Sequence, residues 1–541
     1  MNTPACDYLI VGGGTAGCVL ANRLSADPSC RVILLEAGGP DDDKWIHIPA
    51  GIRYLLREKK HNWFYMTEPS PLTNGRSVYW PRGKVLGGSS SINGMVYIRG
   101  QRSDFDRWAA SGATGWDWDS LFPYFLKIEN QTRGADAYHA VGGPLTVSDR
   151  TNRSEVWTRF IEAAEHLGIP RNPDFNGADQ EGVGYYQATV GNGRRCSAAV
   201  GYLRPVKGRA NLSVITGAMV HHISFEQRRA TGVRYEKDGQ WQELHAAREV
   251  IVCGGSINSP QLLMLSGIGP AAHLQEMGIT PRVDAPQLGK NLQDHLQLRL
   301  TYRLNRPISF NDQFHSLAGK VGMGLEYLLR RSGAIAYPTA QVGLFTRSLP
   351  ELASPDIQYH FSNYTTNEKT GMPDRFPGMT FSVCHLRPES RGEILLRSPD
   401  PGQHPRILPN YLATPEDCRV AIEEVRLTRR LAATQPLADI VAEELAPGPD
   451  VQSDEACLDF ARSNGTSIYH PVGTCRMGSD AEAVVDPALC VRGVSHLRVV
   501  DASVMPTLIS GNTYAATLAI AERAADLILN TRPSASIPQP H

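Results

Sequence analysis

The sequence predicts two regions of different fold class, an α/β Rossmann-like domain and an α+β domain with a mainly antiparallel sheet. Residues 7–36 follow the order strand, glycine-rich turn, helix, strand, which is typical of a parallel sheet. Between about 297 and 446, short alternating strands succeed one another with helices beside them, which favours an antiparallel sheet. At 541 residues the chain is too long for one ordinary core, so two or three domains are expected.

The first strand and helix enclose a glycine motif. The apolar run 8–11 suits a strand buried on both faces, and Gly12, Gly14 and Gly17 follow with the spacing G-x-G-x-x-G. The first glycine allows a tight turn, and the second lets the backbone approach a pyrophosphate. The third lets the helix at 15–25 pack against the strand. The N-terminal N–H groups of that helix would then point at the pyrophosphate.

A carboxylate follows where a ribose-binding group is expected. The second strand, at 32–35, ends at Glu36, which lies 36 − 17 = 19 residues after Gly17. Strand, turn, helix, strand and acid together predict a dinucleotide site, whereas a glycine-rich turn without a ligand is the alternative. The motif does not choose between NAD and FAD.

A second glycine-rich loop covers residues 87–91, Gly-Gly-Ser-Ser-Ser. Its free backbone donors and small side chains allow it to lie against a flat ring or a phosphate. The alternative is a flexible linker. Apolar residues on both sides, at 85–86 and 95–96, argue against a linker, which would be polar.

Apolar periodicity predicts the remaining elements. Helices are expected at 116–126, 154–167, 258–265, 317–330, 415–433 and 514–529. Strands are expected at 211–215, 231–235, 249–253, 298–304, 357–361, 380–386, 392–397 and 494–500. The strands at 249–253 and 494–500 are interpreted as returns of the chain to the first sheet. The Pro- and Ser-rich tail, 532–541, is expected to be disordered.

Composition and charge exclude several classes of function. The formal net charge is −1 and basic residues are scattered, so we expect no nucleic-acid partner. No run of eighteen apolar residues predicts a membrane span, and the first strand begins too early to leave room for a signal peptide. The ten cysteines lack C-x-x-C and zinc-ligand spacing, which indicates buried free thiols in a reducing cytoplasm and no metal site. Peripheral attachment to the inner face of the cytoplasmic membrane stays open, as does the oligomeric state.

Four long motifs resemble those of the glucose–methanol–choline (GMC) oxidoreductases, which bind FAD. Residues 83–106 resemble the first signature of the family and 255–269 the second, and 289–295 and 469–474 are further landmarks. The resemblance runs from about 7 to 529 and is strongest for bacterial alcohol, choline, polyethylene glycol and L-sorbose dehydrogenases. It implies the GMC fold, with an FAD-binding domain at 1–150, 195–296 and 465–531 and a substrate-binding domain at 151–194 and 297–464.

The resemblance also implies which residues contact FAD. It assigns Gly12, Gly14, Thr15, Ala16, Gly17 and Glu36 to the pyrophosphate and ribose, and Arg82, Gly87, Gly88, Asn93, Gly94 and Met95 to a loop over the cofactor. It places Val220 near the adenine, Trp63 near a lid, and Asp501 with Ala502 near the pyrophosphate. Some family oxidases attach FAD covalently through a histidine in the glycine-serine loop. The matching position here is Ile92, so we expect noncovalent FAD.

The resemblance implies transfer of a hydride from an alcohol carbon to flavin N5, with His470 as the base that takes the hydroxyl proton. Histidine has a reference pKa of about 6.5, so a neutral ring is available at pH 7. Asn512 is the expected partner that holds the alcohol oxygen. It also stands at the start of the last predicted helix, so it is equally well explained as an N-cap, and both roles can hold together.

We therefore expect FAD-dependent oxidation of a primary alcohol or polyol to an aldehyde or ketone, with electrons passed to a quinone or another acceptor. An oxidase that uses oxygen and produces hydrogen peroxide is the first alternative, and a non-redox protein similar to hydroxynitrile lyases is the second. Choline is disfavoured because a quaternary ammonium favours an aromatic cage and an acid, and Gln341, the position inspected for an acid, is neutral. Tyr359 and His360 lie on a predicted strand of the substrate-binding domain. Either side chain can face the substrate pocket, and a position in the core is the alternative.

Overall fold

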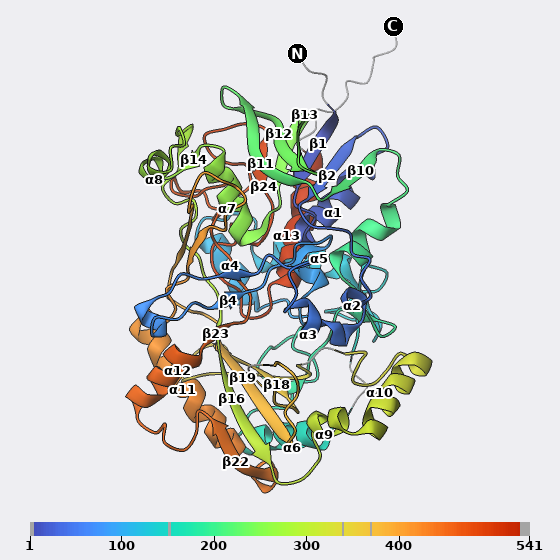
Figure 1. The fold of residues 1–541 in the computed structure, drawn as a ribbon, viewed down its shortest axis with the longest axis vertical. Helices are drawn as coiled ribbons and strands as arrows, with labels where there is room; N and C mark the ends of the chain where they lie inside the picture. The colour runs from blue at the N-terminus through green and yellow to red at the C-terminus, as the bar shows by residue number, and fades with distance from the viewer. Residues whose placement is uncertain (1–4, 150–152, 338–339, 368–369, 531–541) are drawn as a thin grey trace.

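The computed structural model describes residues 5–149, 153–337, 340–367 and 370–530, so the predicted tail at 532–541 lies outside the described residues. Two seven-stranded sheets form the framework, one in each half of the molecule (Figure 1). One sheet is mostly parallel and the other antiparallel, which confirms the predicted combination of an α/β and an α+β fold.

The first sheet has the order β10-β2-β1-β13-β12-β11, with β24 paired to β13. Neighbours from β10 to β13 and β24 are parallel, whereas β11, β12 and the first half of β13 form an antiparallel meander. The long strand β13 thus joins the two parts. The strands are β1 (Cys6–Val11), β2 (Val32–Glu36), β10 (Leu212–Thr216), β11 (Met219–Glu226), β12 (Arg229–Lys237), β13 (Gln240–Val252) and β24 (Leu497–Val499).

Helix α1 (Thr15–Leu24) packs against the last helix, α13 (Tyr514–Asn530). Arg23 joins them through ion pairs to Glu522 and to Asp526, the latter at 2.5 Å. The turn before α1 depends on glycine: a Cβ at Gly17 would lie only 1.9 Å from the carbonyl oxygen of Gly12. Gly17 therefore allows the close packing of helix and turn that its position in the motif predicts.

The second sheet has the order β22-β16-β19-β18-β17-β7, with β23 paired to β16, and every pairing is antiparallel. One face is apolar and packs against α6 (Glu155–His166) and α11 (Pro415–Ala432); Phe160 of α6, for example, stacks on Phe361 at 4.1 Å. The opposite face is polar. The strands are β7 (Gly182–Tyr185), β16 (Leu296–Leu304), β17 (Val342–Thr346), β18 (Ile357–Ser362), β19 (Gly378–His385), β22 (Val441–Ala446) and β23 (Thr466–Ser467).

The remaining elements complete the fold around the two sheets. The remaining helices are α2 (Lys44–His47), α3 (Ile52–Leu55), α4 (Arg102–Ala110), α5 (Trp118–Ile128), α7 (Gly255–Leu265), α8 (Ala271–Glu276), α9 (Phe310–His315), α10 (Leu317–Arg330) and α12 (Asp454–Asn464). Two-stranded pairs are formed by β3 (Tyr65–Met66) with β4 (Tyr79–Trp80), β5 (Glu129–Gln131) with β6 (Leu145–Val147), β8 (Val190–Gly191) with β9 (Arg194–Arg195), β14 (Ile268–Gly269) with β15 (Val283–Asp284), and β20 (Glu393–Leu395) with β21 (Arg406–Leu408). None of the helices in the described ranges has the length and apolar character needed to cross a membrane.

The expected domain boundaries stay a proposal, which the strand positions support. All strands of the first sheet lie within 1–150, 195–296 and 465–531. The strands of the second sheet lie within 151–194 and 297–464, except that β16 begins at Leu296 and β23 lies just beyond 464.

A charged cluster is buried beside β5. The guanidinium of Arg99 lies 2.7 Å from the carboxylate of Glu129, and both side chains are fully buried. His139 lies between two acids, with Nδ1 at 3.0 Å from Glu129 and Nε2 at 2.6 Å from Asp174. The cluster holds the chain segments 97–99, 129–139 and 174–176 together in place of an apolar contact.

We expect His139 to make stability depend on pH. Burial alone would lower the pKa of His139, but its hydrogen bonds to Asp174 and Glu129 outweigh that effect and raise the pKa to about 9. The unfolded value is about 6.5, so the stabilisation is fully present below pH 6.5 and is lost as pH rises through about 9, with a slope of at most about 1.4 kcal/mol per pH unit. Urea unfolding of the His139→Gln variant should give a flatter pH profile in this window. Equal profiles for His139→Gln and the parent protein would contradict the assignment.

Candidate active site

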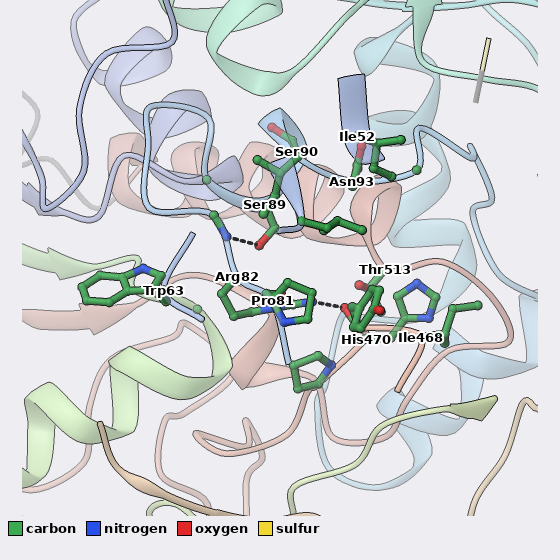
Figure 2. Close-up of a pocket in the computed structure, with 18 of the residues that line it drawn as sticks. Ile52, Trp63, Pro81, Arg82, Ser89, Ser90, Asn93, Ile468, His470 and Thr513 are labelled. Carbon is green, nitrogen blue, oxygen red and sulfur yellow. Dashed lines mark hydrogen bonds between the residues drawn. The ribbon is translucent and has the colours of Figure 1, made fainter. Parts of the chain in front are cut away.

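A cavity of about 950 Å³ is lined by residues of both sheets. Figure 2 shows Trp63 at one end, Ile468 and His470 at the other, and Ser89, Ser90 and Asn93 along one side. Gly17 and Gly87 do not line the cavity. The predicted site residues that do line it are Gly12, Gly14, Thr15, Ala16, Glu36, Trp63, Arg82, Gly88, Asn93, Gly94, Met95, Val220, His470, Asp501, Ala502 and Asn512.

The N-terminus of α1 opens into the cavity. Gly14 is its N-cap residue and provides no side-chain hydrogen bond, so the first-turn N–H groups are available to an anion. Glu36 lies beside the turn and accepts hydrogen bonds from the backbone N–H of Gly13 at 2.8 Å and of Gly38 at 2.7 Å. Burial raises the pKa of Glu36 to about 7, although these two bonds and Lys84 oppose the rise.

The glycine-serine loop lies directly over this turn. Gly88 has a φ of +54°, and a Cβ there would lie 2.7 Å from Cα of Gly14. The serines fix the loop: Ser90 Oγ donates to the carbonyl of Gly87 at 2.6 Å, and Ser89 Oγ accepts from the N–H of Gly83 at 3.2 Å (Figure 2). The loop is thus an ordered cover of the cavity and not a linker.

Arg195, which sequence reasoning missed, holds the end of this loop. It is buried, and its guanidinium donates to the carbonyl oxygen and the side-chain oxygen of Asn93, at 2.8 and 2.7 Å. Asp501 has a comparable role on the opposite side. Its carboxylate accepts from the N–H of Gly255 at 2.8 Å and from Oγ of Ser259 at 2.5 Å, so it fixes the start of α7.

These features fit FAD, which consists of two flat ring systems joined by a diphosphate. The unsatisfied N–H groups of α1 suit the diphosphate, Glu36 suits ribose hydroxyl groups, and the small residues of the loop allow a ring to lie against backbone. In the part of the chain that the structure describes, no group of three or more His, Cys, Asp or Glu side chains is arranged to hold a metal ion.

His470 lies at the other end of the cavity, and its ring nitrogens both have partners. Nδ1 lies 3.0 Å from Nδ1 of His295, and Nε2 lies 3.1 Å from Nδ2 of Asn512. The backbone N–H of His470 donates to the buried carboxylate of Asp294 at 2.7 Å. Because His470 is only 8% exposed, water has little access to its ring.

A backbone carbonyl determines which nitrogen of His470 carries the proton. Nε2 of His295 lies 3.0 Å from the carbonyl oxygen of Leu386, which only accepts, so His295 is protonated at Nε2. Burial lowers the pKa of His295 to about 3, so its ring is neutral and its Nδ1 is an acceptor. His470 must then donate from Nδ1, which leaves a lone pair on Nε2. Burial, followed by the neighbouring His295, His360 and Arg82, also lowers the pKa of His470 well below its ordinary value, so this lone pair is present at neutral pH.

A second backbone carbonyl orients Asn512. The hydroxyl of Tyr186 donates to the carbonyl of Tyr359 at 2.6 Å and accepts from Nε2 of Gln358 at 3.0 Å. Gln358 Nε2 also donates to Oδ1 of Asn512 at 3.3 Å, which turns the Nδ2 group of Asn512 toward His470. Asn512 is not the N-cap of α13, whose first residue is Tyr514, because its side chain is held by Gln358 and His470.

The polar face of the second sheet forms the wall next to His470. Tyr359 is fully buried in the core, whereas its neighbour His360 faces the cavity, as does Ser362 of the same strand. Arg299 pairs with Ser382, and Ser382 with His360, so the three form one row across the sheet. Gln341 is buried and does not line the cavity. The polar residues of this sheet that line the cavity are Gln297, Arg299, Thr301, His360, Ser362, Thr380, Ser382 and Thr466, and the apolar Leu445 and Ala446 of β22 line it at one edge of the sheet.

Comparison with known proteins gives a consistent picture. Two GMC oxidoreductase family models match the chain, over residues 6–297 and 388–521. The chain is 45% identical to "Alcohol dehydrogenase [acceptor]" of Pseudomonas putida, covering 98% of this chain and 97% of the relative. It is 44% identical to mitochondrial choline dehydrogenase of Homo sapiens, covering 96% and 89%. Among solved structures, pyridoxine 4-oxidase from Mesorbium loti matches with a TM-score of 0.89 and 33% identity, covering 98% of this chain and all of that one.

Proposed function

Because the chain belongs to the GMC oxidoreductase family, we propose that it oxidises a polyol or another polar alcohol to an aldehyde or ketone and passes the electrons to a quinone. The family binds FAD, and the chain is an FAD-dependent oxidoreductase that acts on CH–OH donors. The observation that carries the proposal is the 3.1 Å contact between His470 Nε2 and the Asn512 amide, inside the cavity that the glycine turn also lines.

The side chains divide the chemistry between them. FAD, when bound, supplies the hydride acceptor. His470 Nε2 takes the proton of the alcohol hydroxyl, and the Nδ2–H group of Asn512 donates to the alcohol oxygen and holds it in place. His295 keeps the His470 proton on Nδ1, so that the base is present in one tautomer only. We propose that FAD is held without a covalent bond, since Ile92, which lines the cavity, has no nucleophilic atom.

The polar wall of the second sheet supports a polyol more than a simple aliphatic alcohol. Hydroxyl, amide and imidazole groups there can each hydrogen-bond a substrate hydroxyl. A quaternary ammonium fits less well, despite the choline dehydrogenase relative. The cations Arg53, Arg57 and Arg299 line the cavity, whereas Asp374 is the one acid among its described lining residues that lies outside the nucleotide end.

The electron acceptor is proposed by analogy with the acceptor-linked relative from Pseudomonas putida. An oxidase that reduces oxygen to hydrogen peroxide is the second candidate, and the similarity to pyridoxine 4-oxidase favours it. Both candidates share the first half-reaction and differ only in how the reduced cofactor is reoxidised.

An anaerobic titration tests the proposal. We expect polyols to bleach the flavin absorbance of the purified protein faster than aliphatic alcohols of equal length or choline, because of the polar wall. Admission of air should restore the colour slowly, and addition of a soluble quinone should restore it fast. Rapid recolouring in air with production of peroxide would favour the oxidase. An intact flavin that no alcohol bleaches would contradict alcohol oxidation and support the non-redox alternative.

A further inference from the structure

Helix α10 exposes an apolar surface to solvent. Leu317, Val321, Leu325, Leu328 and Leu329, which we call the α10 surface, are between 52% and 79% exposed. At about 100° per residue they fall within an arc of about 120° on one side of the helix. Large aliphatic side chains gathered at such exposure on one helix are typical of an interaction site.

The opposite side of α10 packs against the rest of the molecule. Tyr327 is buried, and its hydroxyl donates to the carbonyl oxygen of Gly193 at 3.3 Å. The helix packs against α9, and Figure 1 shows it at the outer edge of the molecule, beside α9. The inner side of α10 is therefore already packed against the rest of the molecule, and the α10 surface faces solvent.

Cations surround the α10 surface. Lys320, Arg330 and Arg331 of the same segment are exposed, as are Arg57 and Lys59 of the neighbouring segment. That segment lies against α9, since the guanidinium of Arg53 is 5.4 Å from the ring of Phe314. Among the described residues the nearby acids are half-buried: Asp312 caps α9, Glu326 accepts from Ser332 at 3.0 Å, Glu58 pairs with His61 at 2.5 Å, and Asp374 lines the cavity. The region therefore presents positive charge around an apolar strip.

We propose that the α10 surface inserts into the headgroup region of a membrane that contains anionic phospholipid. An amphipathic helix with leucines on one side and Lys and Arg at its margins matches such a surface in both hydrophobicity and charge. The cavity reaches the same region, because Arg53, Arg57 and Thr365 line it and Thr365 contacts Asn311 of α9. A quinone dissolved in the membrane would then have a short path to the cavity; this last point rests on the proposed function.

A second copy of the chain fits the surface less well. The helix has 14 residues and so is about 21 Å long, and a strip about 10 Å wide gives roughly 200 Å² per copy. A stable dimer needs roughly 800 Å² per partner. A two-fold contact would also bring the same cations of both copies together.

Sedimentation of the full-length, FAD-loaded protein with lipid vesicles tests the inference. We expect binding to vesicles of phosphatidylcholine mixed with phosphatidylglycerol, and much weaker binding to phosphatidylcholine alone. The triple variant Leu325→Ser, Leu328→Ser, Leu329→Ser should bind the mixed vesicles ~1,000-fold more weakly, at roughly tenfold per leucine. The matched control carries three serines at exposed aliphatic positions elsewhere, Val141→Ser, Leu167→Ser and Val214→Ser, and should bind like the parent protein.

Oxidation of the alcohol by a soluble dye, without vesicles, should be equal in both triple variants and the parent, which verifies that they are folded and reports on the proposed function separately. Failure of the parent protein to bind either vesicle, or equal binding by the α10 variant, would overturn the inference. Equal binding to neutral and mixed vesicles would overturn the role of the cations. A concentration-dependent dimer that only the α10 variant abolishes would assign the surface to a second copy instead.

Discussion

The His470→Ala variant is expected to retain FAD and to lose about 10²–10⁴-fold in kcat for alcohol oxidation. The loss follows from the position of the ring: His470 Nε2, the proposed acceptor of the hydroxyl proton, lies 3.1 Å from Nδ2 of Asn512, the proposed holder of the alcohol oxygen. The flavin spectrum verifies that cofactor is bound, and anaerobic stopped-flow measurement of flavin reduction isolates the affected step.

The exposed histidine His166, at the end of α6, provides the control, because His166→Ala should leave flavin reduction unchanged. The pH dependence gives a second readout. Since burial keeps the pKa of His470 well below its ordinary value, the parent protein should show no loss of activity near pH 6.5 from protonation of this ring. Unchanged flavin reduction in His470→Ala would remove the proposed base.

The Glu129→Gln variant is expected to lose about 3–5 kcal/mol in free energy of unfolding. The substitution keeps the shape of the side chain but removes the charge, so the fully buried guanidinium of Arg99 keeps its desolvation cost without its counter-ion. His139 loses one of its two acidic partners at the same time. Urea unfolding followed by circular dichroism measures the change.

An exposed ion pair supplies the comparison for this substitution. Glu443 lies 2.8 Å from Arg303, and both side chains are about half exposed. Glu443→Gln should therefore cost about 0–1 kcal/mol, because water and salt already screen the pair. A loss for Glu129→Gln as small as that for Glu443→Gln would show that the buried cluster is readily replaced by neutral hydrogen bonds.

The periodicity of apolar residues along the sequence predicted those helices and strands that have an apolar face. The helix expected at 317–330 has those bounds in the structure, and α1, β2 and β18 differ from expectation by one residue at most. Elements without such a pattern were missed or shortened. Helix α4 was not predicted, because it is mostly polar; its buried Asp104 accepts from the N–H of Ser510, 406 residues away. Strand β13 was predicted only at 249–253, because its first half is a largely exposed hairpin.

The sequence predicted many of the residues that line the cavity, but it did not predict the side chains that orient His470 and Asn512. His470 and Asn512 lie side by side as expected, and the glycine turn lines the same cavity. His295 lay within a motif that resembled the family, but its contact with His470 spans 175 residues and depends on the pairing of the second sheet. Gln358 gave no local signal, because an amide in a strand is distinguished only by the side chain that it meets. The apolar periodicity that predicted α10 also did not show whether the apolar face of this helix would be buried in the protein or exposed to solvent.

The contacts of α1 with α13 and of β13 with β24 determine when the first domain can be completed during synthesis of the chain. The turn that begins at Gly12 leaves the ribosome early, yet β24 and Asp501, which complete its surroundings, belong to the last tenth of the chain. The ion pairs of Arg23 with Glu522 and Asp526 likewise cannot form before α13 has been synthesised. Such long-range pairing makes folding slow and leaves the parallel strands exposed to misassociation while translation continues. The surroundings of the glycine turn can therefore be completed only after β24 and α13 have been synthesised, so we expect FAD to bind after residues 497–530 have emerged and not while the first sheet is still incomplete.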